Sequence, residues 1–142
     1  MGILDSAQDV LGRGAQAAQG VLDKGVTVAK GAVSGVAVEQ QPFMKAFVRL
    51  CTDGWDQGWH ERNGGNLTYR LTDEQVGACR PFFYDNPSSC VSMGVQADNL
   101  RGAFFATTGS GRYMRNVQLD PAANVGIVEI NDAGDAWRIV WG

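Results

Sequence analysis

The chain changes from a helical pattern to a strand pattern at residues 59–68, which read Trp59-His60-Glu61-Arg62-Asn63-Gly64-Gly65-Asn66-Leu67-Thr68. Two asparagines bracket a Gly-Gly pair in this stretch. Glycine permits positive φ angles and close approach of the backbone, and asparagine supplies neutral donors that orient an anion. The same residue types also form ordinary turns, so an anion-binding loop and a plain turn both remain open at this point.

An amphipathic helix is predicted before this loop. Between Phe43 and about Trp59 the apolar residues recur at spacings of three and four, which is the period of one helix face. A stripe of Met and aromatic residues of this kind indicates core packing rather than a cofactor site. The residues of this predicted face are Phe43, Met44, Phe47, Val48, Leu50, Cys51, Trp55 and Trp59.

Strands dominate the prediction after the loop. We expect strands at Leu67–Leu71 and at about Ala103–Thr108, Val125–Ile130 and Ala136–Trp141. The last two are separated by Asn131-Asp132-Ala133-Gly134-Asp135, a sequence typical of a hairpin turn. Between the first two, a short helical turn is expected at residues 73–76 and an irregular, partly buried segment at residues 80–92.

A second glycine-rich loop, Gly109-Ser110-Gly111-Arg112, directly follows the predicted strand at about Ala103–Thr108. By itself it fits a flexible turn. It also offers a hydroxyl and backbone N–H donors, which can bind a dianion without a lysine. Arg112 and Arg115 could compensate the charge of such an anion or could lie on the surface, and the sequence does not decide between these roles.

Taken together, the two loops and their flanks resemble the class II (zinc-dependent) sugar-phosphate aldolases. The resemblance runs from about Phe43 to Gly142, with only a loose match between Thr72 and Asn99. The matching segments are Gly58-Trp59, Glu61-Arg62-Asn63-Gly64-Gly65-Asn66-Leu67-Thr68, Arg70-Leu71, Thr108-Gly109-Ser110-Gly111 and Arg115-Asn116-Val117-Gln118-Leu119-Asp120-Pro121-Ala122-Ala123-Asn124.

The resemblance implies a fold and a binding site. The expected fold is an incomplete α/β/α layer with a mainly antiparallel sheet, preceded by a long amphipathic N-terminal helix. Members of the family are lyases that cleave a ketose 1-phosphate to dihydroxyacetone phosphate and an aldehyde. The residues expected to grip the phosphate are Asn63, Asn66 and Ser110, helped by the backbone at Gly64, Gly65 and Gly109.

The chemistry of the family depends on residues that do not occur in these 142 residues. Its zinc is held by three histidines, and a glutamate in a later segment does the acid/base work. This chain has one histidine, His60, at a motif position that does not bind metal, and a catalytic zinc site needs three protein ligands. We therefore expect no catalytic residue, no metal ligand and no cofactor in this chain alone, and weak binding of a sugar 1-phosphate.

Two classes of function remain open. In the first, the chain is the phosphate-binding N-terminal half of an aldolase, inactive alone, with the missing C-terminal half or other aldolase subunits as its partners. In the second, the chain is a non-catalytic adapter whose N-terminal helix docks on a microcompartment shell, a membrane or a partner helix. Residues 138–141 are expected at or near an unpaired sheet edge, which favours association.

Residues 1–41 differ in composition from residues 42–142 and form a separate predicted arm. The arm has no aromatic residue and no proline, and its apolar residues repeat every eleven positions, as in Val10, Val21 and Ala32. An eleven-residue repeat corresponds to about 3.67 residues per turn and keeps an apolar stripe on one side of a helix. Residues 3–38 are thus the segment expected to dock on a shell, a lipid surface, a partner or the aldolase-like body.

The bulk composition excludes several functions. A formal net charge of −3 with interspersed signs gives no basic surface for nucleic acid. No apolar run approaches the roughly 20 residues that span a bilayer, and the N-terminus lacks the pattern of a secretory signal. Cys51, Cys79 and Cys90 lack metal-site spacing, which favours free thiols and a cytoplasmic location, although a Cys79–Cys90 disulfide is conceivable.

Overall fold

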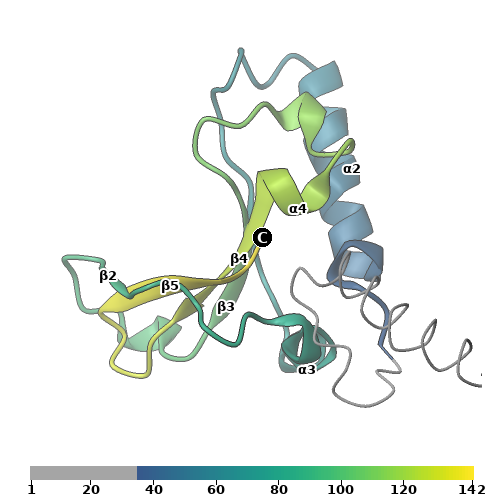
Figure 1. The fold of residues 1–142 in the computed structure, drawn as a ribbon. Helices are drawn as coiled ribbons and strands as arrows, with labels where there is room; N and C mark the ends of the chain where they lie inside the picture. The colour runs from purple at the N-terminus through teal and green to yellow at the C-terminus, as the bar shows by residue number, and fades with distance from the viewer. Residues whose placement is uncertain (1–34) are drawn as a thin grey trace, which may run out of the picture.

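An antiparallel sheet forms the centre of the computed structural model, which describes residues 35–142 (Figure 1). Its five strands lie in the order β1-β3-β4-β5-β2. They are β1 (Thr68–Arg70), β2 (Val91–Ser92), β3 (Phe104–Thr108), β4 (Val125–Ile130) and β5 (Ala136–Trp141). The four predicted strands are confirmed as β1, β3, β4 and β5, the last two with the predicted bounds, whereas β2 lies in the segment that was predicted to be irregular.

The helices also follow local sequence signals. They are α2 (Pro42–Asp56), α3 (Asp73–Cys79) and α4 (Pro121–Asn124), with short 3₁₀ helices at η1 (Val38–Gln40), η2 (Arg80–Phe82), η3 (Asp98–Leu100) and η4 (Met114–Asn116). Proline occupies the first turn of α2, where its missing N–H costs nothing. At α3, Thr72 and Gln75 cap each other's backbone N–H groups in a capping box.

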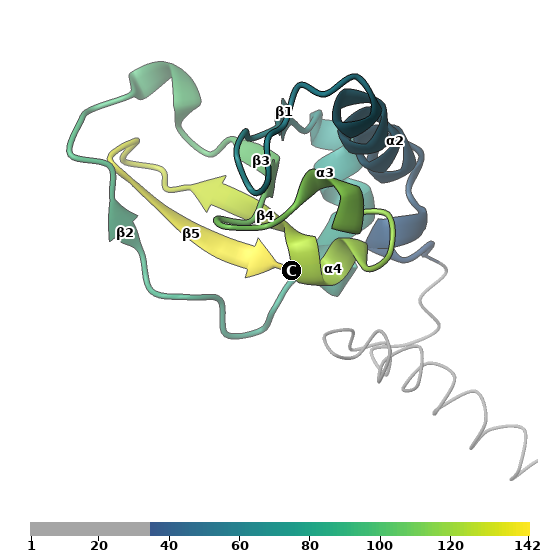
Figure 2. The same cartoon turned by 90° about the horizontal axis from the view of Figure 1, so that it is seen from above.

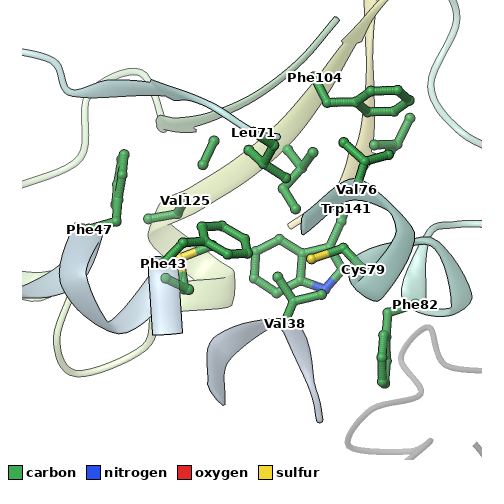
Figure 3. Close-up of a cluster of buried hydrophobic side chains, with 14 of the residues drawn as sticks. Val38, Phe43, Phe47, Leu71, Val76, Cys79, Phe82, Phe104, Val125 and Trp141 are labelled. Carbon is green, nitrogen blue, oxygen red and sulfur yellow. The ribbon is translucent and has the colours of Figure 1, made fainter. Parts of the chain in front are cut away.

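One face of the sheet carries the core. Along β3, Phe104, Ala106 and Thr108 are buried while Phe105 and Thr107 are half-buried, as the period of two requires. The buried side chains pack against residues of α2 and α3, and Trp141 lies in the middle of the cluster (Figure 3). Val38, which precedes α2, is fully buried in the same cluster, so the core begins before residue 42.

Two residues of the predicted helix face lie outside the core. Leu50 is 49% exposed and lines a groove of about 380 Å³ with Leu67 and Tyr69. Trp59 is 70% exposed, because α2 ends at Asp56 and the chain turns away at Gly58, which has φ +73°. The prediction that Leu50 and Trp59 pack in the core was therefore wrong.

The described residues form two layers. Helices α2, α3 and α4 lie on one side of the sheet, as the two views in Figures 1 and 2 show. The opposite face is uncovered by residues 35–142. It presents a shallow hollow of about 330 Å³ lined by Thr68, Phe105, Thr107, Val128 and Trp137. Within the described residues, the expected incomplete α/β/α layer thus consists of an antiparallel sheet with helices on one side.

The sheet edge at the end of the chain is covered, which corrects the expectation of an unpaired edge at residues 138–141. The N–H of Tyr84 donates to the carbonyl of Val140 at 2.8 Å, and the N–H of Ser88 donates to that of Ile139 at 3.2 Å. The hydroxyl of Ser88 accepts from the N–H of Ile139 at 2.8 Å. The irregular segment before β2 therefore satisfies this edge without forming a regular strand.

The three cysteines are free, so the conceivable Cys79–Cys90 disulfide does not form. Cys51 and Cys79 are fully buried, and Cys90 is exposed. Burial in apolar surroundings disfavours the thiolate and raises the pKa of Cys51 to about 11 and that of Cys79 to about 12. Both buried thiols therefore behave as small apolar core residues.

The predicted N-terminal helix falls mainly on residues 1–34, which lie outside the described residues. Its proposed partners and its eleven-residue repeat thus stay predictions. Between residues 35 and 142, no helix combines the length and the hydropathy that crossing a membrane requires.

Candidate anion-binding site

The first loop of the site connects α2 to β1. After α2 the chain forms a tight turn in which the N–H of Gly64 donates to the carbonyl of Glu61 at 2.8 Å. Gly65 follows with φ +87°, a conformation that residues with a side chain rarely adopt. The Gly-Gly pair therefore lets the backbone reverse between Asn63 and Asn66.

The second loop leaves the end of β3. The N–H of Gly109 donates to the carbonyl of Asn124 at 2.8 Å, and the N–H of Arg112 donates to the carbonyl of Gly109 at 3.2 Å. Asn124 is itself held, because its amide donates to the carbonyl of Asp120 at 2.8 Å. The second loop is thus fastened to the end of α4.

Strand pairing brings the two loops together. The strands β1 and β3 are antiparallel, with Thr68 opposite Thr107, so the start of β1 meets the end of β3. Next to this pair, the N–H of Leu67 donates to the hydroxyl of Thr108 at 3.1 Å, and the N–H of Thr108 donates to the carbonyl of Leu67 at 3.0 Å. A Cβ atom built on Gly111 would lie 3.9 Å from Nδ2 of Asn63, so the loops lie side by side.

The predicted phosphate residues present free donors at this junction. Asn63, Asn66 and Ser110 are exposed, and their side chains form no hydrogen bond within residues 35–142. Two amide groups and a hydroxyl are therefore available to a ligand, whereas the N–H groups of Gly64 and Gly109 already donate to the carbonyls of Glu61 and Asn124. Neutral donors on two adjoining loops are suited to orienting an oxyanion.

The two arginines of the second loop differ in their surroundings. The guanidinium of Arg115 lies 5.2 Å from the ring centre of Trp55 and 5.1 Å from that of Tyr113, both within the range of a cation–π contact. Arg112 lies in the loop itself, with its Cγ 3.0 Å from the position of a Cβ on Gly109. Arg115 is thus held against aromatic rings, and Arg112 is the cation nearer the glycine turn.

Sequence reasoning missed three residues that shape the site. Thr108 ties the loops together through Leu67, Asn124 fastens the second loop, and His60 packs against the first. Thr108 could have been found from the alternation of β3, because it is the polar residue at a buried position. Asn124 and His60 carry no such signal, since their contacts join segments that are distant along the chain or lie on either side of a turn.

The described residues do not fit the zinc ion of the family. Between residues 35 and 142, no group of three His, Cys, Asp or Glu side chains is placed to hold a metal ion. The ring of His60 lies against Gly54 and Gly65, and its Nδ1 is buried.

Known proteins resemble this chain in sequence and in fold. Rhamnulose-1-phosphate aldolases of Escherichia coli, from strain K12, from O9:H4 (strain HS) and from O6:K15:H31 (strain 536), are each 41% identical to it over 105 residues. The match covers 74% of this chain and 38% of each relative. No family model matches the chain.

A solved structure shares the fold. The crystal structure of a sugar-phosphate aldolase from Thermotoga maritima superposes with a TM-score of 0.53 at 20% identity, covering 69% of this chain and 38% of that one. Over the matched part, the chain resembles the class II sugar-phosphate aldolases in sequence and in fold. Within that family it is similar to rhamnulose-1-phosphate aldolase, of which it spans 38% of the length.

Proposed function

We propose that this chain supplies the phosphate-binding part of an aldolase that cleaves a ketose 1-phosphate, with rhamnulose 1-phosphate as the first candidate substrate. The observation that carries this proposal is the meeting of two loops whose donors have no partner within residues 35–142. The sequence match to rhamnulose-1-phosphate aldolases supports the same substrate class.

The role of the site is to hold the phosphate and thereby orient the sugar. The amides of Asn63 and Asn66 and the hydroxyl of Ser110 donate to phosphate oxygens, and the backbone around Gly64, Gly65 and Gly109 allows the close approach. A substrate anchored at one end is presented in a fixed orientation to the catalytic groups of the complete enzyme. In this proposal, the catalytic groups and the ligands of the zinc ion lie outside residues 35–142.

Completion by further aldolase polypeptide is part of the proposal. The sheet face around Phe105, Val128 and Trp137 is uncovered by the described residues, and the chain spans 38% of its curated relatives. The proposed partner is therefore the remaining part of an aldolase, in the same or another polypeptide. The proposed location is the cytoplasm. The adapter function expected for residues 3–38 falls mainly on residues outside the described part of the chain and stays a prediction.

A titration followed by ¹H–¹⁵N NMR tests the binding site. Rhamnulose 1-phosphate and inorganic phosphate are each added to the full chain, and the backbone signals of residues 63–66 and 109–111 are expected to shift. Asn66→Asp places a negative charge against the phosphate and is expected to weaken binding at least about tenfold. Asn99→Asp makes the same change at an exposed site at the other end of β3 and is expected to leave binding unchanged.

The outcomes separate clearly. Shifts confined to the two loops, lost in Asn66→Asp and kept in Asn99→Asp, support the site. Absence of shifts at both loops at saturating ligand contradicts it. A coupled assay of dihydroxyacetone phosphate release with added zinc is expected to show no turnover by this chain. Turnover that a chelator abolishes would overturn the proposal that the catalytic groups lie elsewhere.

A further inference from the structure

The imidazole of His60 lies between helix α2 and the first loop of the site. A Cβ atom added at Gly54, within α2, would lie 2.7 Å from Nε2 of His60 and 3.2 Å from its Cδ2. A Cβ atom added at Gly65, within the loop, would overlap Nδ1 and lie 3.1 Å from Cε1. The ring therefore fills the space between two glycines, one in the helix and one in the loop, and touches the backbone of both.

This position is not explained by hydrogen bonding. Nδ1 of His60 is buried and has no hydrogen-bond partner within residues 35–142. A buried polar atom without a partner is unfavourable for stability, so hydrogen bonding does not account for the position of the ring. The contacts of the ring with Gly54 and Gly65 are therefore packing contacts.

The contact controls the part of the chain that carries the phosphate donors. Gly65 directly precedes Asn66, and the positive φ of Gly65 sets the direction in which Asn66 leaves the turn. Because His60 touches the backbone at Gly65, it determines how far this turn stands from α2. Asn63, on the other side of the turn, lies beside Gly111 of the second loop.

We propose that His60 is a positioning residue that holds the 63–66 loop at a fixed distance from α2, so that its donors converge with those of the second loop on phosphate. This inference rests on the phosphate-binding function proposed above. His60 does not itself contact the phosphate in this proposal. The ring sets the position of the loop by its contact with Gly65, and helix α2 sets the position of the ring by its contact with Gly54.

A matched pair of glycine-to-alanine substitutions tests whether helix α2 positions the loop through His60. Gly54→Ala adds a methyl group against His60, which cannot retreat because Gly65 lies on its other side. Trp59 lies 3.3 Å from the same position, but its ring is exposed and can move into solvent. Gly77→Ala makes the same change within helix α3, where no atom lies within 4 Å of the added methyl. Both glycines are helical, so the gain in helix propensity is shared.

Phosphate affinity is the first readout. Gly54→Ala is expected to weaken binding of rhamnulose 1-phosphate about tenfold, and Gly77→Ala to leave it unchanged. In a His60→Ala background, where the ring is absent, Gly54→Ala is expected to cause no further loss. A double-mutant cycle of this kind isolates the part of the effect that passes through His60. Urea unfolding of each variant shows whether affinity merely follows global stability, which the proposal does not expect.

A readout without ligand separates this inference from the proposed function. In the absence of phosphate, Gly54→Ala and His60→Ala are each expected to shift the backbone NMR signals of residues 63–66, whereas Gly77→Ala is not. If the wild-type chain binds no phosphate, the proposed function fails, and these shifts still test the contact. If Gly54→Ala and His60→Ala leave both the loop signals and the affinity unchanged, the positioning role of His60 is overturned.

Discussion

Replacing Thr108 by valine removes the hydroxyl that joins the two loops and keeps the shape of the side chain. The hydroxyl accepts a hydrogen bond from the N–H of Leu67 at 3.1 Å, and Thr108 is 7% exposed. Valine leaves that N–H without its acceptor in a half-buried position. Loss of one partner at such a site costs about 1–2 kcal/mol, so we expect the free energy of unfolding to fall by that amount.

The neighbouring threonine provides the control. Thr107 lies on the uncovered face of the sheet, and its hydroxyl lies 3.1 Å from that of Thr68. Both hydroxyls are accessible to water, which replaces the lost bond. Thr107→Val is therefore expected to change the free energy of unfolding by no more than about 0.5 kcal/mol, although the same atoms are exchanged in the same strand.

Urea unfolding measures both variants, and phosphate titration then compares their affinities. Leu67 directly follows Asn66, so Thr108→Val is also expected to weaken phosphate binding, while Thr107→Val is not. Equal losses of stability in the two variants, or no loss in Thr108→Val, would refute the assignment of Thr108 as the residue that ties the loops.

Two further predictions concern the hairpin and the buried thiols. The side-chain oxygen of Asn131 accepts from the N–H groups of Gly134, Asp135 and Ala136, so Asn131→Ala is expected to lower the free energy of unfolding by about 2 kcal/mol in urea. Burial raises the pKa values of Cys51 and Cys79 in the folded chain from a reference value of 9.0 to about 11 and about 12. The stability that the protonated thiols contribute is therefore complete below about pH 9 and is lost as the pH rises toward the raised pKa values. Each thiol is expected to lower the free energy of unfolding by about 1.4 kcal/mol per pH unit in that window, as measured by urea unfolding at a series of pH values. If Cys51→Ala and Cys79→Ala lose stability with pH as steeply as the wild-type chain, the buried thiols are not the cause. Cys90→Ser, at an exposed thiol, serves as the control.

Local signals predicted most of the secondary structure. The helix α2 was predicted because its apolar residues keep a helical period, and β4 and β5 because alternating residues flank a turn that Asn131 and Gly134 can form. These features depend on residues close together in the chain, so a single sequence contains them. The family resemblance was likewise carried by short segments around the two loops, and the comparisons confirm it.

Long-range packing explains the errors. Leu50 and Trp59 have apolar side chains at helical spacing, but which of them meets the sheet depends on where α2 ends and how it lies on β3 and β4. The edge beside Val140 looked unpaired because the segment that covers it, around Tyr84 and Ser88, has no strand pattern. Spacing along the chain contains no information about such a partner.

The sequence by itself predicted the two glycine-rich loops, their donor residues and the resemblance of the matched part to the class II sugar-phosphate aldolases, because each is encoded by neighbouring residues. Only the tertiary structure decided that the loops meet, since their approach depends on the antiparallel register of β1 and β3 and on the hydrogen bond between Leu67 and Thr108. It also decided the place of His60, whose ring lies against Gly54 and Gly65. These contacts arise when a helix, a turn and a sheet pack together, and packing depends on the shapes of all three.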